Sequence, residues 1–155
     1  MFTALKIVQF ISLILLLLVT GIFWGTWFSL SRSIEKTTPA TFLENGKIII
    51  KNLAVPMRIM MPLTILLMLA GLWLYPMTGT SGFYLNVISF ILIIITLLIT
   101  VLIEVPIDNQ IKRWTVSTLP ADWKALLSEW QLYHTIRTLT SIASSMSLLF
   151  SILFY

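Results

Sequence analysis

The chain has 155 residues, of which 58% are hydrophobic and only 10% are charged, and its mean hydropathy is +0.98. A soluble domain carries about 25% charged residues, so this composition indicates a membrane protein. The net charge of +4 does not indicate nucleic-acid binding, because the basic residues are scattered between apolar runs and form no dense patch. The lack of cysteine excludes disulfides, thiolate metal sites and cysteine nucleophiles.

Four apolar runs predict four membrane-spanning helices. They cover residues 7–30, 59–76, 84–104 and 138–155, and the last helix is expected to begin near residue 120. Each run approaches the ~20 residues that cross about 30 Å of hydrocarbon as a helix. Their continuous hydrophobicity does not fit the alternating strands of a membrane β-barrel. We therefore predict an all-α, polytopic membrane protein, with residues 1–155 forming one four-transmembrane-helix bundle.

The first run is expected to be a retained membrane helix and not a signal peptide, because it is too long and no small-residue cleavage site follows. Trp24 and Trp27 share one face of this helix, where they could stack on a flat ligand. Gly21 and Gly25 form a small-xxx-small pair, which is typical of close helix packing.

The long segment between the first two runs, TTPATFLENGKIIIKNL, predicts an interfacial amphipathic helix. Thr38 is a candidate N-cap, and Pro39 fits the first helical turn. Five apolar residues then fall near one helical face: Phe42, Leu43, Ile49, Ile50 and Leu53. Pro56 and Pro62 are expected to set the angle at which the second membrane helix begins.

The basic residues are distributed unequally between the connections. Nine of the ten lie in the two long connections or at their borders, namely Arg32, Lys36, Lys47, Lys51, Arg58, Lys112, Arg113, Lys124 and Arg137, and the tenth is Lys6. The short connection TGTSGF carries no charge. The positive-inside rule therefore predicts cytoplasmic long loops and both termini outside, in a bacterial inner membrane.

One stripe of the fourth helix combines aromatic and ionisable residues. At 100° per residue its members lie within about 40° of one direction; they are Trp123, Trp130, His134, Arg137 and Ser141. Glu104 ends the third run at the depth where Arg137 precedes the fourth, so an antiparallel helix pair would bring the two level. Asp108 and Asn109 follow directly after Pro106.

Two interpretations of this stripe remain open. Tryptophans at membrane boundaries commonly act as interfacial anchors, and Arg137 could simply snorkel or pair with Glu104. Alternatively, ionisable groups at membrane depth mark a functional site. With a single histidine, the chain cannot form bis-histidine haem ligation or a di-iron site, and no nucleophile elbow or phosphate loop is present. A mononuclear metal site formed by His134, Glu104 and Asp108 stays open as an alternative. The chemistry that the sequence favours is general acid–base catalysis by His134 or a carboxylate, with Arg137 stabilising an anion.

The elements EVPIDNQIKRW and LPADWKALLSEWQLYHTIRTLTS resemble the anthrone oxygenases of aromatic polyketide pathways, a family of small four-helix membrane proteins. The positions that match the family motif are Pro106, Asn109, Trp130, His134 and Arg137. The resemblance implies oxidation of an anthrone-like phenol by O₂ without an obvious cofactor. Together with the residue pattern, it leads us to expect catalytic roles for His134, Arg137, Glu104 and Asp108, and substrate contacts for Asn109, Trp130, Trp24 and Trp27, with no metal.

Three hypotheses for function follow from these observations. The first is a membrane-embedded enzyme acting on a flat lipophilic phenol. The second is a non-enzymatic accessory subunit whose polar stripe or glycine face meets partner membrane subunits. The third is a protein that binds a quinone-like aromatic molecule or a membrane lipid. A polar stripe that faces a cavity among the chain's own helices would favour the first.

Overall fold

The computed structural model describes residues 2–31, 33 and 37–154, and no strand occurs among them. Four of its helices are long and apolar enough to cross a membrane. These findings confirm the predicted all-α four-helix membrane bundle and identify the chain as an integral membrane protein. Arg32 and Lys36, two of the basic residues used to predict topology, lie outside the described residues.

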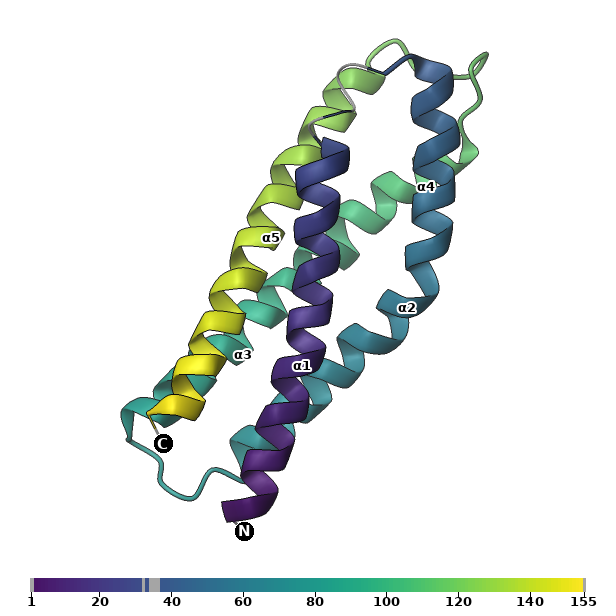
Figure 1. The fold of residues 1–155 in the computed structure, drawn as a ribbon. Coiled ribbons are helices and arrows are strands. Elements are labelled where there is room, and N and C mark those ends of the chain that lie inside the picture. The colour runs from purple at the N-terminus through teal and green to yellow at the C-terminus, as the bar shows by residue number, and fades with distance from the viewer. Residues whose placement is uncertain (1, 32, 34–36, 155) are drawn as a thin grey trace.

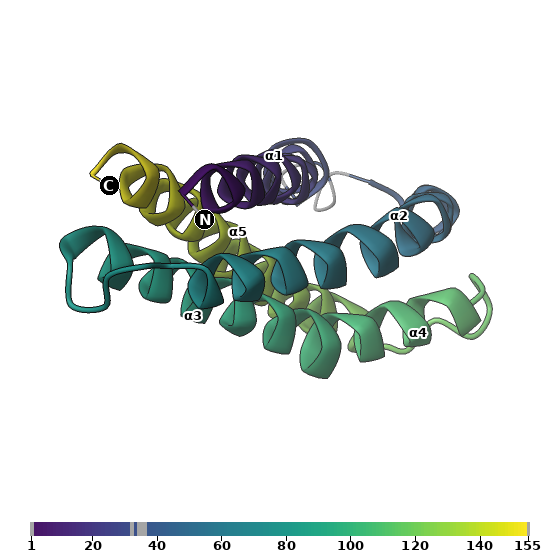
Figure 2. The same cartoon turned by 90° about the horizontal axis from the view of Figure 1, so that it is seen from below.

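In chain order the elements are α1 (Phe2–Thr26), the π-helical turn η1 (Trp27–Ser31), α2 (Pro39–Trp73), α3 (Ser81–Ile99), the π-helical turn η3 (Thr100–Glu104), α4 (Val105–Arg113) and α5 (Trp123–Leu153). The principal contacts connect α1, α2, α3 and α5 in a ring, because α1 packs on α2 and α5 while α3 packs on α2 and α5. Figure 2 shows α1 and α3 on opposite sides of the bundle, with α2 and α5 between them. Both termini and the short connection between α2 and α3 lie at the same end of the bundle (Figure 1).

The amphipathic segment is not a separate interfacial helix, which corrects the prediction. It forms the first part of α2, which runs unbroken from Pro39 to Trp73 over 35 residues and so extends about 52 Å. The predicted N-cap is present, since the Thr38 side chain accepts a hydrogen bond from the Thr41 amide. Pro56 and Pro62 lie inside the helix, and α2 bends in Figure 1 instead of ending. Consequently its first half packs beside α4 as part of the same continuous helix.

The third membrane helix also extends beyond its predicted end at residue 104. Pro106 has no amide hydrogen and its ring crowds the preceding turn, which disfavours regular α-helix there. The helix is wider at this point and forms a π-helical turn, in which the Val105 amide donates to the Thr100 carbonyl five residues earlier. Helical structure then continues to Arg113. Such π-helical turns occur frequently at functional sites, and this one places Glu104 inside the bundle with 1% of its surface exposed.

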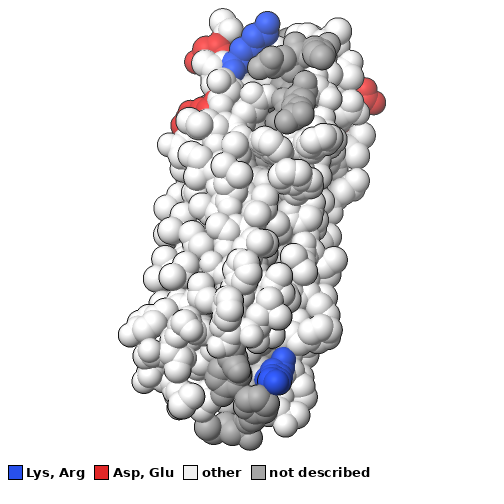
Figure 3. Space-filling view, turned by 60° about the vertical axis from the view of Figure 1, so that its left-hand side comes forward, with Lys and Arg blue, Asp and Glu red and all other residues white. Residues whose placement is uncertain are grey.

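Two apolar clusters form the core. The cluster near the long connections contains Phe42, Leu43, Ile107, Ile111, Leu127 and Trp130. The cluster nearer the termini contains Leu16, Met61, Met68, Ile93 and Leu148. On the face shown in Figure 3, charged side chains gather at the two ends of the bundle and the broad middle is uncharged. This distribution suits a protein whose middle is surrounded by hydrocarbon.

Candidate functional site

The centre of the site is an ion pair buried between η3 and α5. The Arg137 guanidinium pairs with the Glu104 carboxylate, as the matching depths of these residues predicted. Arg137 also donates from Nη1 to the Thr100 hydroxyl at 3.3 Å. Exposure of Glu104 is 1% and of Arg137 is 9%, so both charges are largely withdrawn from solvent. A buried pair of this kind is tolerated because each charge neutralises the other, and Arg137 is also hydrogen-bonded by Thr100 and His134.

His134 is fully buried behind this pair, one turn before Arg137 on α5. Its Nε2 lies 3.2 Å from the Phe23 carbonyl oxygen, which can only accept a hydrogen bond. Its Nδ1 lies 2.7 Å from Nη2 and 3.2 Å from Nε of Arg137, both of which can only donate. The contacts therefore assign the ring proton to Nε2 and make Nδ1 an acceptor for Arg137. Nδ1 is 3.4 Å from Glu104 Oε1, which completes a His–Arg–Glu cluster.

Aromatic rings enclose the cluster on two sides. The Trp130 ring is stacked on the His134 imidazole, with 4.7 Å between centroids and 7° between planes. The Phe23 ring meets the same imidazole edge-on, and the Arg137 guanidinium carbon lies 4.4 Å from its centroid. Cation–π contact of this kind stabilises a desolvated guanidinium. The rings thus fix the orientation of both His134 and Arg137.

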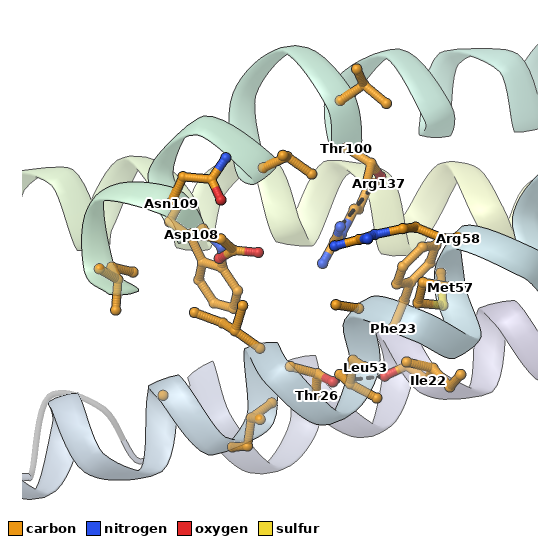
Figure 4. A pocket seen from close by; sticks show the side chains of 18 of the residues that line it. Ile22, Phe23, Thr26, Leu53, Met57, Arg58, Thr100, Asp108, Asn109 and Arg137 are labelled. Carbon is orange, nitrogen blue, oxygen red and sulfur yellow. Dashed lines mark hydrogen bonds between the residues drawn. The ribbon is translucent and has the colours of Figure 1, made fainter. Parts of the chain in front are cut away.

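Arg137 faces a cavity of about 530 Å³ between the two core clusters. Residues from α1, α2, η3, α4 and α5 line it, and most of them are apolar, including Ile22, Leu53, Met57, Val101 and Leu127. Its size lies within the ~300–1,000 Å³ typical of small-molecule sites. Figure 4 shows Asp108 and Asn109 on one side of the cavity, with Arg137 and Phe23 on the other. An apolar ligand held here would have a carboxylate at one side and a guanidinium at the other.

The predicted site residues divide into three groups by position. Asp108, Asn109, Trp130 and Arg137 line the cavity. His134 and Glu104 contact Arg137 from behind and do not belong to the cavity lining. Trp24 and Trp27 also lie outside the lining. Their rings contact each other at a tilt of 39° with 5.3 Å between centroids, and the Trp27 indole donates to the Thr135 hydroxyl. Trp24 is 46% exposed on the surface of the bundle.

The structure adds residues that the sequence analysis did not assign to a site. Phe23 and Thr100 contact Arg137, and Arg58 and Lys112 line the cavity. Only Arg58 carried a signal in the sequence, as a charge between two prolines at the start of an apolar run. Among the residues that the structure describes, no group of three or more His, Asp and Glu is placed to hold a metal ion.

Comparison with known proteins supports the resemblance seen in the sequence. The sequence model of a family described as anthrone oxygenase matches residues 52–147, which is more than half of the chain. The matched part contains the His–Arg–Glu cluster together with Arg58, Asp108 and Asn109, and it excludes Trp24 and Trp27. No curated protein and no solved structure gives a match to the chain.

Proposed function

Because the chain belongs to the anthrone oxygenase family, we propose that it is a membrane-embedded enzyme that oxidises a flat, lipophilic phenol with O₂ and without a bound cofactor. One observation carries this proposal: the Asp108 carboxylate and the Arg137 guanidinium line the same apolar cavity. To form a carbanion from a lipophilic substrate, an enzyme needs a base that removes the proton and a fixed cation that stabilises the resulting negative charge. The apolar cavity offers both groups.

In the proposed reaction, Asp108 acts as the general base. It removes a proton from the CH₂ group that is activated by the neighbouring rings and carbonyl of an anthrone-like substrate. Arg137 stabilises the negative charge that spreads onto the substrate oxygen. The carbanion then gives its electrons to O₂ and forms a C–O bond, and the resulting hydroperoxide loses water. The net change converts CH₂ and O₂ into C=O and H₂O, with O₂ as the oxidant.

His134 and Glu104 are proposed as positioning residues in this scheme, because both contact Arg137 and neither lines the cavity. Both ring nitrogens of His134 are engaged within the cluster, so the imidazole has no free nitrogen to direct at a substrate. Trp130 and Phe23 replace Trp24 and Trp27 as the proposed aromatic contacts, since the first two line the cavity. The Asn109 amide is proposed to hydrogen-bond a substrate oxygen.

The test is O₂ uptake by the purified protein with a tricyclic phenolic anthrone. Asp108→Asn keeps the size of the side chain and removes the base, so turnover should fall by about 10²–10⁴-fold. Asp122→Asn is the matched control, because Asp122 is exposed just before α5 and makes no side-chain cap bond. Equal turnover in the Asp108→Asn variant and the wild type would overturn the proposed mechanism. Ligand binding by the wild type without any O₂ uptake would favour a quinone-like or lipid-binding function instead.

A second candidate function is an accessory subunit of a larger membrane complex. The observation that favours it is the Gly21 and Gly25 face of α1, which is exposed and has no heavy atom within 4 Å of either added Cβ position. Small residues on a membrane helix permit close approach of another helix. If this face binds a partner subunit, Gly21→Leu should abolish co-purification of that subunit and leave O₂ uptake unchanged. Loss of O₂ uptake in Gly21→Leu would count against a purely accessory role.

For the orientation, we propose that the end carrying the long connections is cytoplasmic and that both termini are outside, in a bacterial inner membrane. The support is the excess of basic residues in these connections. The chain lacks cysteine, so single cysteines can report accessibility directly. With a membrane-impermeant maleimide on intact spheroplasts, Thr78→Cys should be labelled and Ser117→Cys should be protected until lysis. The reverse pattern would invert the topology.

A further inference from the structure

We propose that Arg58 on α2 recognises an anionic group of the substrate, so that the preferred substrate is a flat aromatic acid and not a neutral aromatic. Arg58 lines the cavity, and Figure 4 shows its side chain extending into the cavity toward the side where Arg137 lies. This inference deepens the function proposed above and rests on it for the identity of the ligand as a substrate.

The charges around the cavity leave Arg58 without a counterion. Arg137 is paired with Glu104, and Lys112 follows Asp108 one helical turn later on α4. Arg58 forms no ion pair or hydrogen bond with any of the residues that the structure describes. Arg58 is itself exposed, so its side chain borders the apolar cavity and is not enclosed by it. A ligand anion at this border would form a charge-assisted, bidentate contact with the guanidinium. We therefore infer that the ligand supplies the counterion.

The position of Arg58 on α2 is consistent with an inward role. Val55 and Ile59 on the same helix are 61% and 62% exposed and belong to the apolar outer surface. Met57 and Met61 line the cavity. Arg58 lies at the border between these two faces, and its side chain turns toward the cavity (Figure 4). The long, planar guanidinium is suited to bind a carboxylate through two parallel hydrogen bonds.

The two sides of the cavity then hold different parts of the same ligand. An anionic group at Arg58 would direct the rest of an aromatic ring system across the apolar floor, which includes Leu53 and Ile22, toward Asp108. Because Asp108 is itself an anion, it disfavours a ligand bound in the reverse orientation. Arg58 would thereby select both the substrate and the direction in which it binds.

The experiment measures binding of anthracene-2-carboxylate and of its neutral carboxamide to the full chain in phosphatidylcholine nanodiscs, by quenching of tryptophan fluorescence. The wild type should bind the carboxylate about tenfold or more tightly than the amide, as expected for a charge-assisted bidentate contact. Arg58→Gln should bind both probes equally, and Arg58→Lys should keep part of the preference. Lys51→Gln is the matched control, since Lys51 is an exposed cation of α2 outside the cavity lining. An unchanged preference in Arg58→Gln would overturn the inference.

A second arm separates a substrate from a lipid headgroup, which can carry the same charge. The measurements are repeated in nanodiscs containing phosphatidylglycerol. Unchanged carboxylate binding there supports a substrate. Loss of carboxylate binding in the wild type but not in Arg58→Gln would assign Arg58 to a lipid headgroup and overturn the substrate assignment. The fluorescence assay measures binding and does not depend on turnover. If the wild type shows Arg58-dependent binding but consumes no O₂, the proposed oxidation is wrong and the inference about Arg58 still holds.

Discussion

The two halves of the bundle contain different kinds of buried polar side chain. In the half nearer the termini, hydroxyl groups pair across the helices: Thr20 contacts Ser141 at 2.5 Å and Ser145 at 3.0 Å. Ser89 and Ser144 donate to each other's carbonyl oxygens at 2.7 and 2.8 Å. These small residues allow close packing and satisfy each other. In the other half, α2 bends and a mostly apolar cavity includes four charged side chains in its lining, namely Arg58, Asp108, Lys112 and Arg137.

This difference indicates which half of the bundle can bind a ligand. Mutually bonded hydroxyls hold α3 and α5 together. The buried amides of Gln9 and Asn86 in this half have no complete set of hydrogen-bond partners among the described residues, but they do not line the cavity. The charged half instead keeps Arg137 rigid through Glu104 and His134, while Asp108 lines an open space. Lys47 supports this half by donating to the Trp114 carbonyl, which ties α2 to the end of α4. The hydroxyl-paired half and the half that contains the cavity therefore share the same helices.

The largest effect on stability is expected from removing one member of the ion pair in the half that contains the cavity. Arg137→Met leaves the Glu104 charge buried without its partner, which should lower the free energy of unfolding by about 3–5 kcal/mol. Unfolding in mixed micelles with increasing SDS measures this change. The double variant Glu104→Leu/Arg137→Met is the control, and it should recover most of the stability without recovering turnover. A single variant as stable as the wild type would show that the pair does not organise this half.

Removal of His134 should affect activity more than folding. In His134→Ala, Arg137 loses two hydrogen bonds and is free to shift, so kcat should fall on the order of 10²-fold. External imidazole should not restore the rate, because His134 does not line the cavity. Steady-state O₂ uptake with and without imidazole measures both effects. Rescue by imidazole would identify His134 as a proton carrier and contradict its role as a positioning residue.

Enlarging a small residue should have opposite outcomes in the two halves. Ser144→Phe forces a ring into a fully buried position and should destabilise the bundle by about 1–3 kcal/mol. Ala54→Phe places the same ring in the cavity, so stability should change by less than about 0.5 kcal/mol. Binding of anthracene-2-carboxylate should be lost only in Ala54→Phe. Tight binding by Ala54→Phe would mean that the ligand occupies another site.

The smallest effect is expected from a single hydroxyl of the paired half. Ser89→Ala removes a hydrogen bond to α5 and should cost about 0.6 kcal/mol, and not more than ~1.7 kcal/mol. Turnover should remain at the wild-type level, because Ser89 does not line the cavity. SDS unfolding and O₂ uptake on the same preparation test both points. A loss of activity here would link the two halves functionally.

Much of this arrangement was predictable from local pattern. The four apolar runs predicted the four membrane helices, and the spacing of Trp130, His134 and Arg137 placed them on one face. The depth of Glu104 predicted its pairing with Arg137. Helix boundaries were less predictable, because Pro56, Pro62 and Pro106 were expected to bend or delimit helices that in fact continue through them. A bilayer-spanning helix tolerates proline when a bend or a π-helical turn satisfies the freed backbone groups.

The sequence alone determined that this is a four-helix membrane protein of a recognisable family, because hydrophobic run length and helical periodicity are local properties of the chain. Only the tertiary structure decided which side chains meet a ligand. His134 and Arg137 lie on one helix face, yet Arg137 faces the cavity and His134 is sealed behind it. Arg58 and Asp108, 50 positions apart, line one space because α2 packs against α4. Such proximity depends on how helices pack, which no local pattern encodes.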